Sequence, residues 1–185
     1  MHNRLSKKID LLIFLLVIFI LASMAFNLKY LHIFRTMEKN RQLVVGNAAP
    51  KFSAKDLNGR QWTVPQEQKS FLLIFFNTTC NSCRLSMPYI EKSYSQFLLK
   101  GIQIIGLCSS NIESTLSYRN SVGINFPVIA DQKKNIFRKY KIHYVPTLIW
   151  IRGNKKIAHV QAYGESVKQS INLIIQKLGG INVRK

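Results

Sequence analysis

The hydrophobic positions of this chain form one long run near the N-terminus and several short runs after it. The long run, Leu11 to Phe26, holds 16 residues without a charged side chain. A bilayer core is spanned by about 20 apolar helical residues, and the flanking positions 9–10 and 27–28 bring the run close to that length. We therefore expect residues 1–27 to form a transmembrane signal-anchor and residues 28–45 to form a polar tether.

A cleaved signal peptide is the alternative interpretation of the same segment. Ser23-Met24-Ala25 offers small residues where a signal peptidase would cut. Lysine and arginine flank the apolar run on both sides, so the positive-inside rule does not settle the orientation. The segment predicts a protein that reaches the membrane, either anchored in it or secreted across it.

The short apolar runs predict strands that alternate with helices. Continuous runs such as Phe71–Phe76 are typical of strands buried on both faces, and Asn58-Gly59 predicts a hairpin turn. We expect strands at 71–76, 102–107, 126–130, 147–151 and 156–162, and helices at 81–100, 112–122, 132–140 and 166–178. This alternation predicts an α/β domain over residues 46–180, with a central mixed sheet covered on both sides, followed by a basic tail at 181–185.

The charge is strongly positive, at +19, and it is spread along the chain. Residues 40–185 hold 21 Lys and Arg against six Asp and Glu, so the predicted domain is itself basic. Such a protein is attracted to anionic surfaces, either a bilayer or a nucleic acid. No nucleic-acid-binding motif accompanies the charge, so we expect a membrane partner and no nucleic acid. The alternative is that the charge is only a solvated basic face, or reflects a generally basic proteome.

Two of the three cysteines, Cys80 and Cys83, stand at C-x-x-C spacing between a predicted buried strand and a predicted helix. A cysteine at a helix N-terminus has its thiolate stabilised by free N–H groups and the helix dipole. Cys80 is therefore the expected nucleophile toward a partner disulfide, and Cys83 is expected to resolve the mixed disulfide. A structural zinc site needs about four ligands, and too few other Cys and His residues accompany this pair.

The third cysteine, Cys108, ends the second predicted buried strand. If that strand is the neighbour of Phe71–Phe76, Cys108 lies on the same rim as the dithiol. It would then be either a third thiol that resolves or regulates, or a small buried hydrophobic residue.

Several motifs together resemble the TlpA/ResA-like family of thioredoxin-fold thiol-disulfide oxidoreductases. They are GNAAPKF followed by DLNG at 46–59, FLLIFFNTTCNSCRLSMPYI at 71–90, GINFPV followed by Asp131 at 123–131, and VPT at 145–147. The resemblance implies a thioredoxin-like fold in which Pro146 is a cis proline facing the dithiol. It also implies that the main chain of Val145 binds an extended substrate segment, as in strand addition.

The sequence departs from the family's pattern at the positions that influence the redox potential and the proton transfer of the dithiol. Thr79 replaces the usual aromatic residue before the first cysteine, and Asn81-Ser82 stands between the cysteines. The acid found beneath the dithiol in related enzymes is replaced by Ile74, and the alternative position holds Ser110. Glu113 is the nearest acid, either as a substitute proton acceptor or as a solvated helix residue.

We therefore expect a membrane-anchored, extracytoplasmic thiol-disulfide oxidoreductase that uses the Cys80–Cys83 disulfide and no other cofactor or metal. The family resemblance implies that it reduces disulfide-containing partners, for example apocytochrome c, with electrons from a transmembrane thiol donor. His143 and Tyr144 are candidates for the docking surface, although either residue could serve only packing or solvation.

Two other functions are considered. A thiol peroxidase of the related fold would need Thr and Pro where Asn77 and Leu73 stand. A copper-binding or delivery module would use Cys80, Cys83 and His143, since thiolates suit Cu(I).

Overall fold

The computed structural model describes residues 2–41, 43–161 and 164–179, and it divides into the units Met1–Gln42 and Leu43–Lys185. The first unit is the helix α1 (His2–Arg41). Its segment Leu12–Leu31 has 20 residues with a mean hydropathy of 2.4 and exposed side chains, and is long and apolar enough to cross a membrane. Twenty helical residues rise about 30 Å, the thickness of a bilayer core. This is consistent with the predicted anchor, and the helix continues through residues 28–41 of the expected tether.

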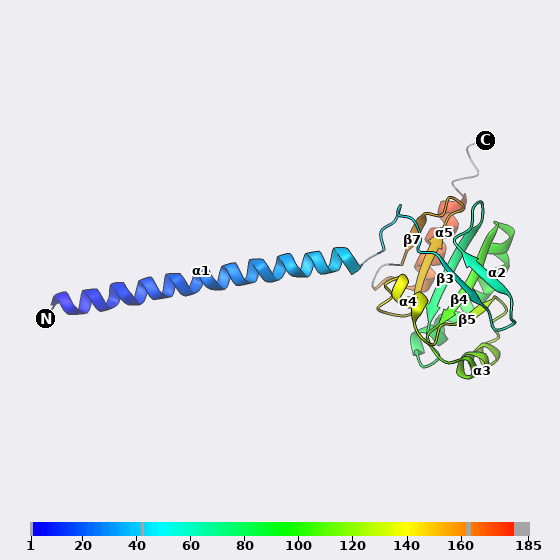
Figure 1. The fold of residues 1–185 in the computed structure, drawn as a ribbon, viewed down its shortest axis with the longest axis horizontal. Coiled ribbons are helices and arrows are strands. Elements are labelled where there is room, and N and C mark those ends of the chain that lie inside the picture. Colours follow the sequence, from blue (N-terminus) through cyan, green and yellow to red (C-terminus); the bar gives the residue numbers. More distant parts are fainter. Residues whose placement is uncertain (1, 42, 162–163, 180–185) are drawn as a thin grey trace. The chain divides into compact units, whose positions relative to one another are not determined.

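The second unit is built on a five-stranded sheet with the order β5-β4-β3-β6-β7 (Figure 1). Its strands are β3 (Ser70–Phe76), β4 (Ile102–Cys108), β5 (Val128–Ala130), β6 (Thr147–Ile151) and β7 (Ile157–Val160). Strand β4 pairs parallel with both β3 and β5, whereas β6 pairs antiparallel with β3 and with β7. The mixed sheet predicted from the apolar runs is confirmed.

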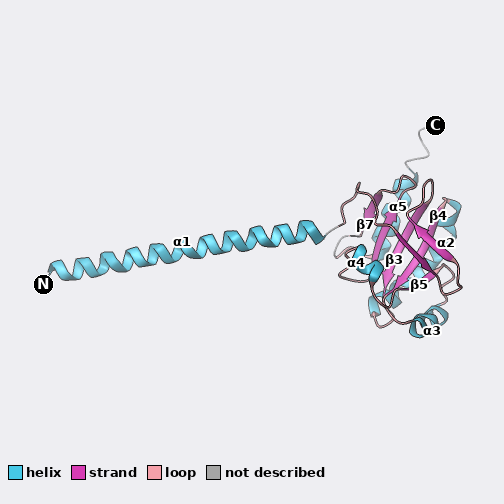
Figure 2. Ribbon diagram, viewed as in Figure 1, coloured by secondary structure: helices cyan, strands magenta, loops and turns pink. Residues whose placement is uncertain are grey.

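The strands alternate their side chains between two apolar layers, one on each face of the sheet. Leu72, Ile74 and Phe76 of β3 pack with residues of α2 (Asn81–Leu99) and α5 (Val167–Gly179). The intervening β3 residues pack with the hairpin and with α4 (Asn135–Lys139) on the other face. Both layers explain why β3 is apolar from Phe71 to Phe76: neither face of this stretch meets water. Figure 2 shows the strands as the central layer of this unit, and the remaining helix, α3 (Ile112–Val122), follows β4.

The Asn-Gly turn predicted from the sequence joins β1 (Phe52–Lys55) and β2 (Gln61–Val64), which pair antiparallel. Asp56 holds this turn through its carboxylate. One oxygen accepts the backbone N–H groups of Asn58 and Arg60, and the other accepts the indole N–H of Trp62 at 2.8 Å. Gly59 has a φ of +82°, which the glycine adopts without a steric penalty.

Three predicted elements are shorter in the structure than expected. The helix predicted at 132–140 is only Asn135–Lys139, because the Asp131 carboxylate accepts the N–H groups of Asn135, Ile136 and Phe137 and so fixes where the helix begins. The strand predicted at 126–130 begins at Val128, after Pro127, which has no N–H for the ladder. The strand predicted at 156–162 covers Ile157–Val160, and the predicted tail at 181–185 lies outside the described residues.

Candidate functional site: the dithiol and its surroundings

The two cysteines of the C-x-x-C motif lie where β3 ends and α2 begins, as the sequence predicts. Cys80 is the N-cap residue of α2, and its Sγ accepts the backbone N–H of Cys83 at 3.1 Å. The two residues form a disulfide bond, with their Cα atoms 5.2 Å apart. After reduction, the same N–H group and the helix dipole would stabilise a thiolate on Cys80.

The two sulfur-bearing residues differ in their access to solvent. Cys83 is fully buried and belongs to the apolar layer formed by α2 and α5, whereas Cys80 is half-buried. A partner disulfide can therefore reach Cys80 but not Cys83. This asymmetry matches the roles expected for them, nucleophile for Cys80 and resolving thiol for Cys83.

The loop that opens β6 lies directly against the dithiol. The Val145–Pro146 peptide bond is cis, as the family resemblance implies, and the Val145 carbonyl oxygen is 3.7 Å from Cys80 Sγ. Thr147 Oγ1 donates a hydrogen bond of 2.8 Å to the Tyr144 carbonyl oxygen and braces the loop from inside. The structure thus brings the four residues predicted for catalysis and substrate binding, Cys80, Cys83, Val145 and Pro146, to one place.

A groove of about 350 Å³ runs beside Cys80, between the dithiol loop, the cis-proline loop and α4. His143 and Tyr144, the two residues proposed for a docking surface, both line it. The sequence did not reveal that Lys134 and Arg138 also line this groove. Both belong to a stretch that the pattern marked only as helical.

A buried polar network, which sequence reasoning missed, supports the cis-proline loop from behind. The Gln161 carboxamide accepts the Leu148 N–H at 3.0 Å and donates to the Glu165 carbonyl oxygen at 2.6 Å. Tyr144 Oη donates to the Gln161 carbonyl oxygen at 2.9 Å, and burial, with the nearby Glu165 carboxylate, raises the pKa of Tyr144. The only sequence signal for this network was the presence of polar residues within a predicted strand. The same pattern is equally typical of a strand edge that faces solvent.

His159 extends this network into the space between β7 and α5. Its Nε2 lies 3.1 Å from Ser170 Oγ, which donates to the Glu165 carboxylate at 2.8 Å. Burial lowers the pKa of His159; the Glu165 carboxylate partly opposes this effect, and Lys177 adds to it. These surroundings favour the neutral form of the imidazole.

Glu113, the predicted proton acceptor, is exposed at the beginning of α3. It lines a second hollow, of about 520 Å³, together with Thr78 and Arg84, whereas Cys80 lines the groove described above. Ser110, at the other position considered for an acid, is hydrogen-bonded through Oγ to Thr78 Oγ1 at 2.8 Å. The structure does not bring Glu113 and Cys80 into the same hollow, and the role of Glu113 stays a prediction.

The free cysteine Cys108 is fully buried at the end of β4, in register with Phe76 of β3. The two strands are neighbours, as the prediction of a shared rim required. Its zero exposure is what a small hydrophobic residue would show, and it keeps the thiol from direct attack by a partner.

Among the described residues, no three His, Cys, Asp or Glu side chains cluster as metal ligands. His143, which the copper hypothesis needs, lines the groove with Cys80, while Cys83 is fully buried.

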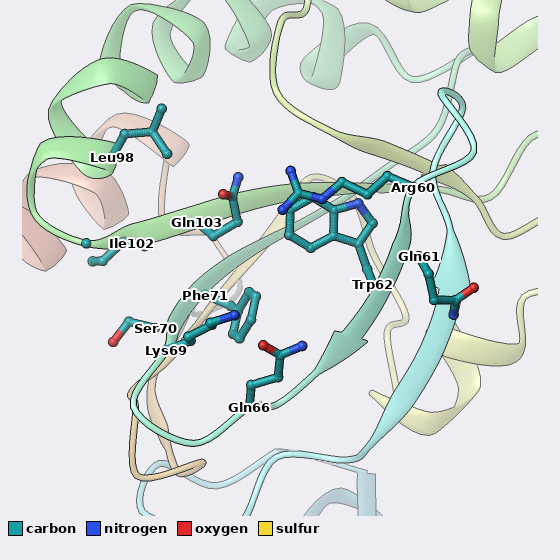
Figure 3. Close-up of a pocket in the computed structure, with 11 residues that line it drawn as sticks. Arg60, Gln61, Trp62, Gln66, Lys69, Ser70, Phe71, Leu98, Ile102 and Gln103 are labelled. Atoms are coloured by element: carbon teal, nitrogen blue, oxygen red, sulfur yellow. The ribbon is translucent and has the colours of Figure 1, made fainter.

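A further hollow, of about 440 Å³, lies at the opposite end of the sheet, where β3 and β4 begin (Figure 3). The Arg60 guanidinium lies over the Trp62 ring, 4.3 Å from its centroid, at one side of this hollow. Ser70 and Ile102, the first residues of the two strands, line it on the other side. It is separated from the dithiol by the length of the strands.

Comparison with known proteins agrees with this geometry. Residues 45–160 match the AhpC/TSA family. The chain is 28% identical over 174 residues to the thiol-disulfide oxidoreductase ResA of Bacillus thuringiensis, covering 93% of this chain and 98% of that protein. It is 30% identical over 134 residues to ResA of Halalkalibacterium halodurans, covering 70% and 76% of the two chains.

Solved structures show the same fold. The thioredoxin domain of a thiol-disulfide oxidoreductase from Bacteroides vulgatus superposes with a TM-score of 0.65 at 22% identity, over 74% of this chain and 99% of that one. A thiol:disulfide interchange protein DsbE from Chlorobium tepidum gives a TM-score of 0.63 at 21% identity, over 72% and 98%. The expected thioredoxin-like fold is therefore confirmed, and the chain belongs to the AhpC/TSA family as a ResA-like thiol-disulfide oxidoreductase.

Proposed function

We propose that this oxidoreductase reduces disulfide bonds in extracytoplasmic partner proteins, with Cys80 as the attacking thiolate. The observation that carries the proposal is the pairing of a half-buried Cys80 with an available main-chain edge at Val145. Among the described residues, nothing accepts a hydrogen bond from the Val145 N–H. An extended partner segment can pair with this edge and so place its disulfide against Cys80.

The reaction transfers two electrons from the dithiol to the partner. The Cys80 thiolate attacks one sulfur of the partner disulfide, a mixed disulfide forms, and the other partner sulfur leaves as a thiolate that takes up a proton. The Cys83 thiol then loses its proton and attacks Cys80 Sγ, which releases the second partner thiol. The domain is left with the Cys80–Cys83 disulfide that the structure contains. In this scheme the cysteine pair is the whole redox centre, without a further cofactor or metal.

We further propose that α1 anchors the chain in the membrane and that the domain works on the extracytoplasmic side. The apolar segment Leu12–Leu31 supports the anchor. The redox-active disulfide of the half-buried Cys80 supports the side, because disulfides persist in oxidising compartments. A transmembrane thiol donor must then return two electrons after each cycle. The family resemblance makes apocytochrome c, whose haem-binding cysteines must be reduced, our proposed partner.

Trapping of the mixed disulfide tests this function. In the full chain carrying Cys83→Ser, Cys80 should stay covalently linked to its partner, and mass spectrometry of non-reduced complexes from the native cell identifies that partner. Cys80→Ser in the same background is the matched control and should trap nothing. A trapped apocytochrome supports the maturation role, whereas the absence of any linked partner in Cys83→Ser cells would overturn the reductase proposal.

A further inference from the structure

The charged side chains that line the groove beside Cys80 are all of one sign, positive. Its lining includes Lys134, Arg138 and His143 but no Asp or Glu. The Lys134 ammonium has no hydrogen-bond or ion-pair partner among the described residues, and the Arg138 guanidinium has only the Asn135 side chain. These cations are therefore available to a ligand in the groove.

The acid closest to these cations in sequence does not neutralise the groove. The Asp131 carboxylate is only 7% exposed, and both of its oxygens accept backbone N–H groups at the start of α4. Its negative charge is turned toward the helix and away from solvent. The groove thus carries its positive charge on Lys134, the N-cap residue of α4, and on Arg138 of α4, and Cys80 and Val145 line the same groove.

An extended segment paired with Val145 projects alternate side chains to opposite sides. With its cysteine at Cys80, the residues that flank this cysteine lie in the groove, within reach of Lys134 and Arg138. From this placement we propose that the oxidoreductase selects partner segments with Asp or Glu next to the reactive cysteine, and that Lys134 and Arg138 are its specificity-determining residues. This inference rests on the proposed function and adds the charge class of the substrate.

The expected effect is a moderate preference that depends on salt. An exposed ion pair changes an equilibrium or rate constant by about threefold, and the factors of two pairs multiply, so an acidic segment is favoured over a basic one by about tenfold at low ionic strength. The Debye length shortens from about 10 Å at 0.1 M salt to about 3 Å at 1 M salt. The preference should therefore shrink strongly across that range.

Three synthetic peptide disulfides test the inference, identical except for two residues flanking one cysteine, which are Glu, Ser or Lys. The full chain in uncharged detergent is reduced, and the second-order rate constant for each peptide is measured at low and high salt. We expect the order Glu, Ser, Lys from fastest to slowest in the wild type. The double variant Lys134→Glu/Arg138→Glu should reverse this order.

The matched control is Lys100→Glu/Lys168→Glu, which changes the net charge equally at exposed positions outside the groove. It should keep the wild-type order. Because Lys134 has a φ of +54°, a region that Asn tolerates, Lys134→Asn/Arg138→Gln provides a neutral variant that should abolish the preference.

The outcomes separate the inference from the function on which it rests. Equal rates for the three peptides in the wild type, or reversal by the control as well, would overturn the groove's role and leave the reductase intact. Failure to reduce any of the peptides would overturn the proposed function and the inference with it.

Discussion

Replacement of Gln161 by leucine should show how much the buried network behind the cis-proline loop contributes to stability. Gln161 is only 3% exposed, and its carboxamide bridges the Leu148 N–H and the Glu165 carbonyl oxygen. Leucine is of similar size but offers neither acceptor nor donor. The buried Leu148 N–H would lose its acceptor, which costs about 1–3 kcal/mol, and the half-buried Glu165 carbonyl adds less because water can reach it. We expect a loss of about 2–3 kcal/mol.

For a domain of this size, that loss lowers the Tm by about 6–12 °C. Thermal unfolding of the oxidised full chain, followed by tryptophan fluorescence, measures it. Both tryptophans, Trp62 and Trp150, are buried in the domain, so α1 does not contribute to the signal. Gln96→Leu, at an exposed position of α2, is the control and should stay within about 0.5 kcal/mol of the wild type. If Gln161→Leu has the same Tm as the control variant, the argument that this carboxamide satisfies the hydrogen bonds of the Leu148 N–H and the Glu165 carbonyl oxygen is refuted.

Three further substitutions test other parts of the domain by the same thermal assay. Asp131→Asn replaces one of two oxygens that together accept three N–H groups at the start of α4, and should cost about 1.5–3 kcal/mol; an unchanged Tm would mean that the carboxylate is dispensable there. Burial lowers the pKa of His159 in the folded chain below its ordinary 6.5. As the pH falls, the unfolded chain therefore takes up this proton before the folded chain does. The folding stability present above pH 6.5 is then lost as the pH falls through the folded-state pKa. His159→Gln should therefore flatten the decline of Tm with acid, while the exposed His143→Gln should not; equal slopes in the two variants would contradict this cause. Gly153→Ala would place a Cβ 2.9 Å from a backbone carbon and should cost about 1–3 kcal/mol, whereas Gly179→Ala meets no atom within 4 Å; matching Tm values for the pair would show that the backbone yields freely.

The sheet could be predicted from the sequence because its strands have a clear pattern. The central strands are apolar at nearly every position, since both faces are covered, and the Asn-Gly turn marks the hairpin directly. The short helix α4 was predicted too long, because its start is fixed by the Asp131 side chain and not by periodicity. Hydrophobic patterns indicate which positions are buried, but they do not indicate which polar side chain fixes the start or the end of a helix.

The dithiol could also be predicted, because both cysteines belong to one motif with a strand before it and a helix after it. The cationic side of the groove could not, since it depends on bringing Lys134 and Arg138 across to Cys80, more than 50 positions earlier in the chain. The cis bond before Pro146 came from family resemblance alone. Sites assembled from several loops need the fold before their members can be recognised.

Cys83 must lose its proton before it attacks Cys80 Sγ, and some group near the dithiol must accept that proton. Cys83 and Ile74 are both fully buried in one apolar layer, so no carboxylate stands where related enzymes place one. Ser110 offers a hydroxyl, which can pass a proton on but does not retain it at neutral pH. Glu113 or bulk water is then left to take the proton from Cys83 and pass it to the departing partner sulfur.

Replacement of Glu113 by glutamine distinguishes these two acceptors. If the carboxylate takes the proton, release of the partner from the mixed disulfide should slow by about tenfold or more near neutral pH, within the range of general-base effects, and recover as the pH approaches about 8.5, where a cysteine ionises unaided. Stopped-flow measurement of partner release from the mixed disulfide, over about three pH units from pH 6 to 9, tests this expectation. The range spans the ordinary pKa of a thiol. Glu67→Gln, which removes an exposed acid that pairs with Lys155, controls for the loss of one charge. A pH profile for Glu113→Gln that superposes on the wild type would assign the proton to water, and the exposed position of Glu113 would then reflect only a solvated first turn of α3.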